Sequence, residues 1–133
     1  MDADDLKERT KQFALRVLKL VAALPKTIEG KAIAGQLVRA VTSVGSNYRA
    51  SRRARSKAEF IAKIGIVEEE ADESAFWLEL IIEAELLKKE LVESLLAEAS
   101  EIAKIMARSR ISAAANASRQ SAIGNRKSAM TYG

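Results

Sequence analysis

The chain has 133 residues, with 22 Lys and Arg against 18 Asp and Glu, a formal net charge of +4, and neither Cys nor His. This length argues for one domain, and the two missing residue types exclude disulfides, thiolate metal sites and histidine as a base or metal ligand. The polar, acidic start does not resemble a secretory signal, and no apolar run reaches the roughly 18 residues of a membrane span. We therefore expect a soluble, cytoplasmic protein.

The first helix is expected over about residues 3–24. Apolar residues recur there at steps of three and four, which places them on one helical face. Acidic residues at the start suit the positive end of the helix dipole. Pro25 should end the helix, because the residue before a proline is pushed out of the helical region. The predicted inward face carries Leu6, Thr10, Phe13, Val17, Leu20 and Leu24.

The second helix is expected over about residues 28–53. Gly30, Gly35 and Gly45 each lower helix propensity by about 1 kcal/mol relative to Ala. They could mark close contacts between helices, and Gly30 or Gly45 could instead mark a break. The predicted inward face carries Ile33, Leu37, Ala40, Val44 and either Tyr48 or Asn47.

The third helix is expected over about residues 57–87. Ser56 followed three residues later by Glu59 is the capping-box pattern, so Ser56 is the predicted N-cap. The middle of this helix, residues 68–73, is strongly acidic (EEEADE). The predicted inward face has the most regular spacing in the chain: it carries Phe60, Ile64, Val67, Ala71, Ser74, Leu78 and Ile81.

The fourth helix is expected over about residues 91–115, with Leu95, Ala99, Ile102 and Met106 inward. Residues 116–133 have little apolar periodicity and are predicted to form a basic, mobile tail. From residue 108 onward the chain has no acid, and its cations are Arg108, Arg110, Arg119, Arg126 and Lys127. The tail could be an electrostatic arm that orders on nucleic acid, or a passive extension.

Four amphipathic helices with short connections predict an all-α, antiparallel, up-down four-helix bundle over residues 1–115. The third helix is apolar all round at residues 76–82 (FWLELII), which indicates burial on more than one side. We predict an oligomer interface there, although the first or fourth helix could cover the same side chains. The predicted interface residues are Phe76, Trp77, Leu80 and Leu87.

Three spaced elements carry a resemblance to a known family: TSVGSNYR at residues 42–49, RARSKAEF at 53–60 and EEADES.FWLEL at 69–80. The segment from about residue 36 to 87 resembles the 23S rRNA-intervening sequence proteins. The resemblance implies a small bacterial protein that forms a four-helix bundle and a ring-like homopentamer. Some members are encoded within insertions in ribosomal RNA genes. A related set accompanies the reverse transcriptases of diversity-generating retroelements and binds nucleic acid through basic surfaces, which suggests a reverse transcriptase as a protein partner.

The basic stretch NYRASRRARSKAEF, residues 47–60, is the candidate binding site for RNA or DNA. Arginine suits phosphate because its planar fork donates two parallel hydrogen bonds. The candidate residues are Arg49, Arg52, Arg53, Arg55, Lys57 and Lys63. The same cations could instead cap the second helix or form salt bridges with a neighbouring subunit. Few aromatic residues lie nearby, so binding should involve the nucleic-acid backbone with weak sequence preference.

No catalytic residue, metal site or cofactor is predicted. The di-iron pattern of four-helix bundles requires His, which is absent, and a carboxylate-only Mg²⁺ site in the acidic segment is the weaker interpretation. A solvated face with partners at i, i+4 spacing, or salt bridges to the basic stretch of a neighbouring subunit, explains the acids better. Ser43 has no base to activate it. Ser43 and Asn47 are instead expected to fix helix register through hydrogen bonds.

Overall fold

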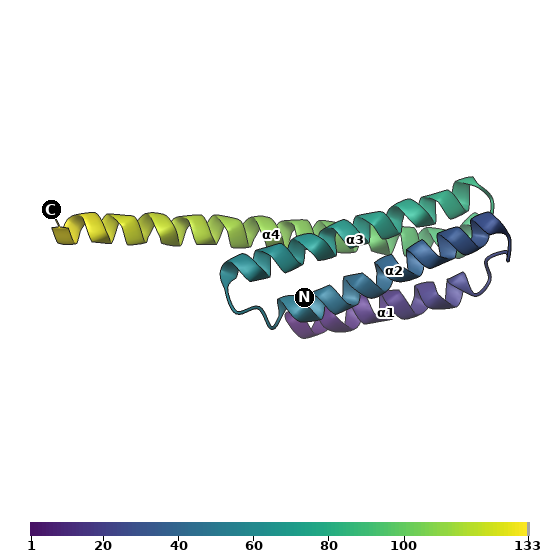
Figure 1. The fold of residues 1–133 in the computed structure, drawn as a ribbon, viewed down its shortest axis with the longest axis horizontal. Helices are drawn as coiled ribbons and strands as arrows, with labels where there is room; N and C mark the ends of the chain where they lie inside the picture. Colours follow the sequence, from purple (N-terminus) through teal and green to yellow (C-terminus); the bar gives the residue numbers. More distant parts are fainter. Residues whose placement is uncertain (133) are drawn as a thin grey trace.

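The computed structural model describes the backbone of residues 1–132 and the side chains through residue 124. The described chain is all-α, with the helices α1 (Ala3–Val21), α2 (Ile28–Ser51), α3 (Lys57–Glu83) and α4 (Lys89–Tyr132). Each helix packs along the next one, and α1 also contacts α4, which closes the bundle. The α1–α2 and α3–α4 connections lie at one end of the bundle and the α2–α3 connection at the other (Figure 1).

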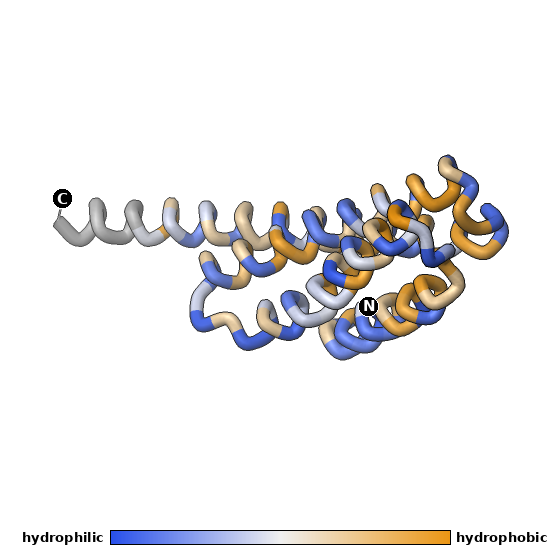
Figure 2. Tube along the Cα trace, turned by 45° about the vertical axis from the view of Figure 1, so that its right-hand side comes forward, coloured by the Kyte–Doolittle hydropathy of each residue, from blue (hydrophilic) through white to orange (hydrophobic). Residues whose placement is uncertain are grey.

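One hydrophobic core runs along the axis of the bundle. All four helices contribute side chains that are almost fully buried, and Figure 2 shows the hydrophobic positions recurring along each helix. Burying one such side chain stabilises the fold by about 1.5–3 kcal/mol. Large residues in this core include Phe13, Val17, Leu37, Val41, Val44, Ile64, Val67, Leu78, Ile81, Val92, Ile102 and Met106. None of the four helices, as far as the chain is described, has the length and apolar character to cross a membrane.

The starts of α1, α2 and α3 are capped by side-chain oxygens. Asp2 and Asp5 form a reciprocal capping box at α1, and Thr27 accepts the backbone N–H of Gly30 at α2. Ser56 accepts the N–H of Glu59 at 3.0 Å, which confirms it as the N-cap of α3. The predicted capping box is only half formed, because the Glu59 carboxylate accepts the N–H of Arg55 instead of that of Ser56.

Three helices end earlier than predicted, because turn geometry ends them before the apolar pattern does. Helix α1 stops at Val21, and tight backbone bonds then turn buried Leu24 into the core ahead of Pro25. Helix α3 stops at Glu83, where Glu85 adopts a left-handed conformation with φ 56°. The N–H of Glu85 bonds to Ile82 and that of Leu86 to Ile81, the pattern of a Schellman cap.

Helix α2 also stops early, at Ser51, where the hydroxyl bonds the carbonyl of Tyr48. It runs without a break through its three glycines. At Gly30 an added Cβ would lie 2.1 Å from the carbonyl oxygen of Pro25, whereas at Gly35 it would meet nothing within 4 Å. Gly30 therefore permits a close approach of the α1–α2 connection, and Gly35 has no such role within the chain.

Helix α4 is longer than the sequence pattern predicts. It was expected to end near residue 115, but it continues to Tyr132 and extends past the α2–α3 connection (Figure 1). A segment without an apolar face can still be helical when it continues a helix that has already formed, because no new nucleation is needed. The Ala, Ser, Arg and Gln residues here are compatible with a helix. The predicted mobility of residues 116–133 stays a prediction, and the side chains of Arg126 and Lys127 lie outside the described residues.

Candidate nucleic-acid interface

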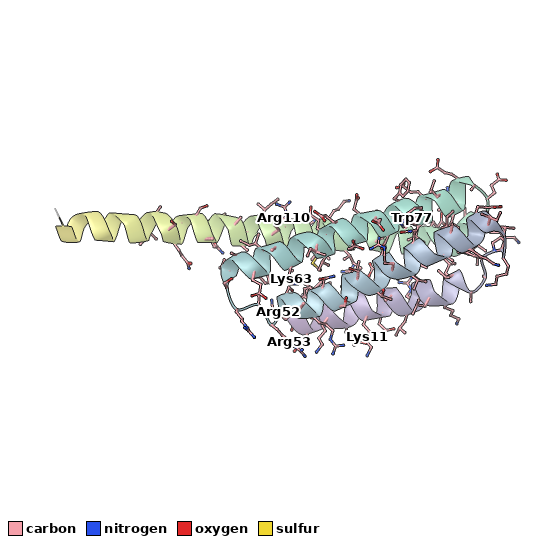
Figure 3. The ribbon with its side chains drawn as sticks, viewed as in Figure 1. Lys11, Arg52, Arg53, Lys63, Trp77 and Arg110 are labelled. Atoms are coloured by element: carbon pink, nitrogen blue, oxygen red, sulfur yellow. The ribbon has the colours of Figure 1, made fainter. Side chains whose placement is uncertain are left out.

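The six predicted cations gather where α2 passes into α3. We call this set the Arg corner; it consists of Arg49, Arg52, Arg53, Arg55, Lys57 and Lys63. The end of α2 and the N-cap at Ser56 leave only a short turn between the two helices, so residues close in sequence stay close in space. Figure 3 shows Arg52, Arg53 and Lys63 at this end of the bundle.

The Arg corner is accessible, and its side chains form no salt bridge with the side chains that the structure describes. Five of its side chains are exposed, and that of Lys63 is half-buried. Among the side chains that the structure describes, none of the six cations forms a salt bridge, whereas Arg9, Arg39 and Arg110 each do. The bundle therefore uses other arginines for its internal ion pairs and leaves the charges of the Arg corner available to a ligand.

Two local contacts shape the corner. The guanidinium of Arg52 lies over the ring of Phe60, 6.0 Å from its centroid, a cation–π contact that also covers the ring. Tyr48 is 3% exposed, and burial raises the pKa of its phenol. The two aromatic residues near the corner are thus engaged within the chain, so neither offers a free face on which a base could stack.

Arg49 has different neighbours from the other residues of the Arg corner. It lines a groove between α1 and α2 together with Lys7 and Lys11 and the acids Asp4 and Glu8. Gly45 also lines the groove, and a Cβ there would lie 3.8 Å from the backbone oxygen of Thr10 on α1, an ordinary contact. Lys7 and Lys11 balance Asp4 and Glu8 in charge, so Arg49 gives the groove its net positive charge.

The predicted interface residues differ in how much surface they leave free. Phe76 is 49% exposed, whereas Trp77, Leu80 and Leu87 are half-buried. Trp77 and Leu87 pack against the core of their own chain, and Trp77 donates its ring N–H to Glu73 at 3.2 Å. The rings of Phe76 and Trp77 meet edge to face, with centroids 5.0 Å apart. Phe76 is the member of the set with the most surface available to a partner.

The polar pair on α2 makes local hydrogen bonds. The side-chain amide of Asn47 donates to the backbone oxygen of Ser43 at 3.0 Å and to its hydroxyl at 2.8 Å. These described bonds stay within α2, so they hold the two side chains on one helix and do not join it to another. Three buried hydroxyls, those of Thr10, Ser51 and Ser74, likewise bond to carbonyls of their own helices.

The acidic segment of α3 pairs with arginines that the sequence interpretation did not select. Arg39 on α2 bonds to both Glu70 and Glu73. Arg110 on α4 reaches Glu68 at 2.6 Å, and this hydrogen bond raises the pKa of the guanidinium. Within the chain, α3 therefore presents these acids toward α2 and α4, and the predicted salt bridges between the acids and the basic stretch of another subunit stay a prediction.

Another ion pair joins the first helix to the last. Arg9 on α1 binds both carboxylate oxygens of Glu98 on α4, at 2.7 and 2.8 Å. Sequence spacing gives no signal for such a pair, because its partners are 89 residues apart. It strengthens the contact that closes α1 against α4.

Comparisons with known proteins agree with this architecture. The sequence model of the family described as 23S rRNA-intervening sequence protein matches residues 4–108. A crystal structure of a protein with unknown function from the S23 ribosomal protein family of Bacteroides thetaiotaomicron is 35% identical, with a TM-score of 0.71. The similarity covers 76% of this chain and 94% of that chain. A search of curated proteins finds no match. The family match stops 24 residues before the end of α4 at Tyr132.

Proposed function

Because this chain belongs to the 23S rRNA-intervening sequence protein family, we propose that it is a non-enzymatic bundle protein that binds the backbone of RNA or DNA through the Arg corner. The observation that carries the proposal is the contrast in pairing. Arg9, Arg39 and Arg110 pair with carboxylates of another helix, whereas the arginines of the corner are exposed and clustered without such a partner among the described side chains.

Backbone contact suits the corner better than base recognition. Arginine donates a rigid pair of hydrogen bonds to phosphate oxygens, and clustered cations attract a polyanion through released counterions. Tyr48 is buried and Phe60 lies beneath Arg52, so neither ring is available for a base to stack on. The corner should therefore bind with a steep salt dependence and little preference for sequence.

An oligomer would multiply this surface. The proposed assembly is a ring-like homopentamer of antiparallel, up-down bundles, as the family resemblance implies. Phe76, 49% exposed beside Trp77, supports an apolar contact on the outer face of α3. Repetition around a ring would place several Arg corners along one nucleic acid and raise its affinity by multivalency. A bacterial, cytoplasmic setting and a reverse-transcriptase partner follow by the same analogy.

A second candidate role is that of a protein scaffold whose Arg corner forms salt bridges between subunits. The exposed acids Glu69 and Asp72 on α3 favour it, since neither forms a salt bridge among the described residues. In this role, removing the corner charges would weaken the oligomer and not the binding of nucleic acid.

The test is a salt titration of binding to labelled structured RNA and to duplex DNA. The test variant replaces Arg49, Arg52, Arg53 and Arg55 with Ala. The matched control replaces Lys26, Lys31, Lys88 and Lys89, four exposed cations at the other end of the bundle, with Ala. The control removes the same net charge, so it distinguishes a loss of binding at the Arg corner from a loss caused by the lower charge of the whole protein.

We expect the wild type and the control to bind alike. The Arg variant should lose affinity, and its logarithmic salt slope on duplex DNA should fall by about 3–4, since each phosphate contact contributes about 0.9. Mass measurement of each oligomer accompanies the titration. An equal loss of affinity in both variants would contradict a specific binding site at the Arg corner. Dissociation of the Arg variant's oligomer would favour the scaffold role.

A further inference from the structure

The part of α4 beyond the bundle is a basic helical segment outside the family match. We call residues 114–132 the C-terminal arm. The last well-buried side chain before it is Ala113, 7% exposed, and the described side chains of residues 114–124 are exposed except for half-buried Ala117. No acid follows Glu101 in the sequence. The arm is therefore a helix of basic sequence that extends from the bundle, with solvated side chains over residues 114–124 apart from Ala117.

The arm leaves the bundle at the end that carries the Arg corner. In Figure 1, α4 passes beyond the α2–α3 connection, the turn that holds Arg52, Arg53 and Arg55. A nucleic acid held on the corner would lie near the base of the arm, and Arg108, exposed on α4 before the arm begins, adds a further positive charge. The two basic surfaces can thus act on one ligand.

One face of the arm carries side chains suited to base edges. Asn116, Arg119, Gln120 and Ile123 follow the spacing i, i+3, i+4 and i+7, so they fall within an arc of about 100°. All four are exposed, Ile123 by 50%. Asn and Gln pair bidentately with adenine, Arg with guanine, and an apolar group contacts the methyl of thymine. The same spacing is used by the recognition helix of homeodomains.

The remaining surface of the arm allows a close approach. Its other described positions are Ala, Ser or Gly, which keep the helix narrow. A B-form major groove, about 12 Å wide, admits an α-helix, whereas the deep major groove of A-form RNA does not. From residue 116 to 123 the helix rises about 10 Å, or about three base-pair steps.

We propose that the C-terminal arm lies in the major groove of duplex DNA and recognises about three base pairs through Asn116, Arg119 and Gln120, with Ile123 against a thymine methyl. This inference rests on the proposed binding of nucleic acid and goes beyond it. The Arg corner supplies affinity for any backbone, and the arm supplies a preference for sequence.

The test is selection from a pool of randomised duplex DNA by the full chain. The test variant is Asn116→Ala, Arg119→Ala, Gln120→Ala, which keeps good helix formers on exposed positions. The control is Ser118→Ala, Ser121→Ala, on other faces of the same helix. The wild type and the control should enrich the same short sequence, and the test variant should lose that enrichment.

A second readout separates recognition from charge. On a fixed DNA, the salt slope of the test variant should fall by no more than about one, the share of a single arginine. Its discrimination between enriched and scrambled duplexes should fall about tenfold or more.

Three results would overturn the inference. The wild type could bind DNA without enriching any sequence, the test variant could enrich the same sequence as the wild type, or RNA alone could be bound. In each of these the Arg corner still stands as a backbone site. Failure of the wild type to bind either nucleic acid at low salt would refute both proposals together.

Discussion

Gly30 and Gly35 of α2 should respond to substitution by alanine in opposite directions. At Gly30 an alanine Cβ would lie 2.1 Å from the carbonyl oxygen of Pro25 and 3.1 Å from the hydroxyl of Thr27. A carbon normally approaches a carbonyl oxygen no closer than about 3.3 Å, so the backbone must retreat by about 1 Å. At Gly35 the new methyl group meets nothing within 4 Å.

The magnitudes follow from this geometry. Overpacking against backbone typically costs about 1–3 kcal/mol, and Gly30→Ala also disturbs the Thr27 cap, whose bond to the Gly30 N–H is 3.1 Å. Gly35→Ala should stabilise by about 0.5–1 kcal/mol, because alanine loses less backbone entropy in a helix. For a chain of this size 1 kcal/mol corresponds to about 3–4 °C in Tm.

Thermal and urea unfolding followed by circular dichroism would measure both variants. The protein concentration must be held constant, since an oligomer links stability to concentration. We expect Gly30→Ala to melt below the wild type and Gly35→Ala above it. A Gly30→Ala protein as stable as the wild type would refute the close approach at Pro25, and two variants shifted in the same direction would refute the distinction between the sites.

Two further predictions concern α3 and the buried phenol. Glu85→Gly should stabilise the protein by about 1 kcal/mol in urea unfolding, because glycine adopts the left-handed cap without strain, and Glu85→Ala should give no such gain. Burial raises the folded-state pKa of Tyr48 above its ordinary 10.0. The contribution of the neutral phenol to the free energy of unfolding is therefore complete below about pH 10, and it is lost as the pH rises through the folded-state pKa. Tyr48→Phe should therefore flatten the alkaline decline in the free energy of unfolding, and an unchanged decline would contradict the role of this phenol.

The helical faces could be predicted from the sequence because burial follows periodicity. On α3 the predicted residues Ile64, Val67, Leu78 and Ile81 are all at most 1% exposed, and Phe60 is half-buried against the core. Steps of three and four place residues on one face whatever the partner helix is. The gathering of Arg52, Arg53 and Arg55 at the α2–α3 turn follows from their closeness in sequence, and the binding role of the Arg corner stays a prediction.

Features that depend on two distant segments could not be predicted. The pairing of Arg39 with Glu70 and Glu73 requires knowing which side of α2 faces α3, and hydrophobic spacing does not give that rotation for exposed charges. Helix ends depend on turns such as the one at Glu85, where a residue other than glycine takes the left-handed cap. The extension of α4 beyond residue 115 had little apolar periodicity to reveal it, because the described side chains of residues 114–124 are exposed apart from half-buried Ala117.

The unbroken passage of α4 from bundle to arm has a consequence for how the arm orders. Starting a helix in isolation is unfavourable by a factor of about a thousand, whereas adding a residue to an existing helix is nearly neutral. Because residues 89–113 are packed in the bundle, they serve as a permanent nucleus for the residues that follow. The helicity of the arm is therefore coupled to the fold of the bundle. Amide-exchange protection should decline gradually along α4 beyond Ala113, and destabilising the bundle should shorten the arm before any contact in the arm itself is changed.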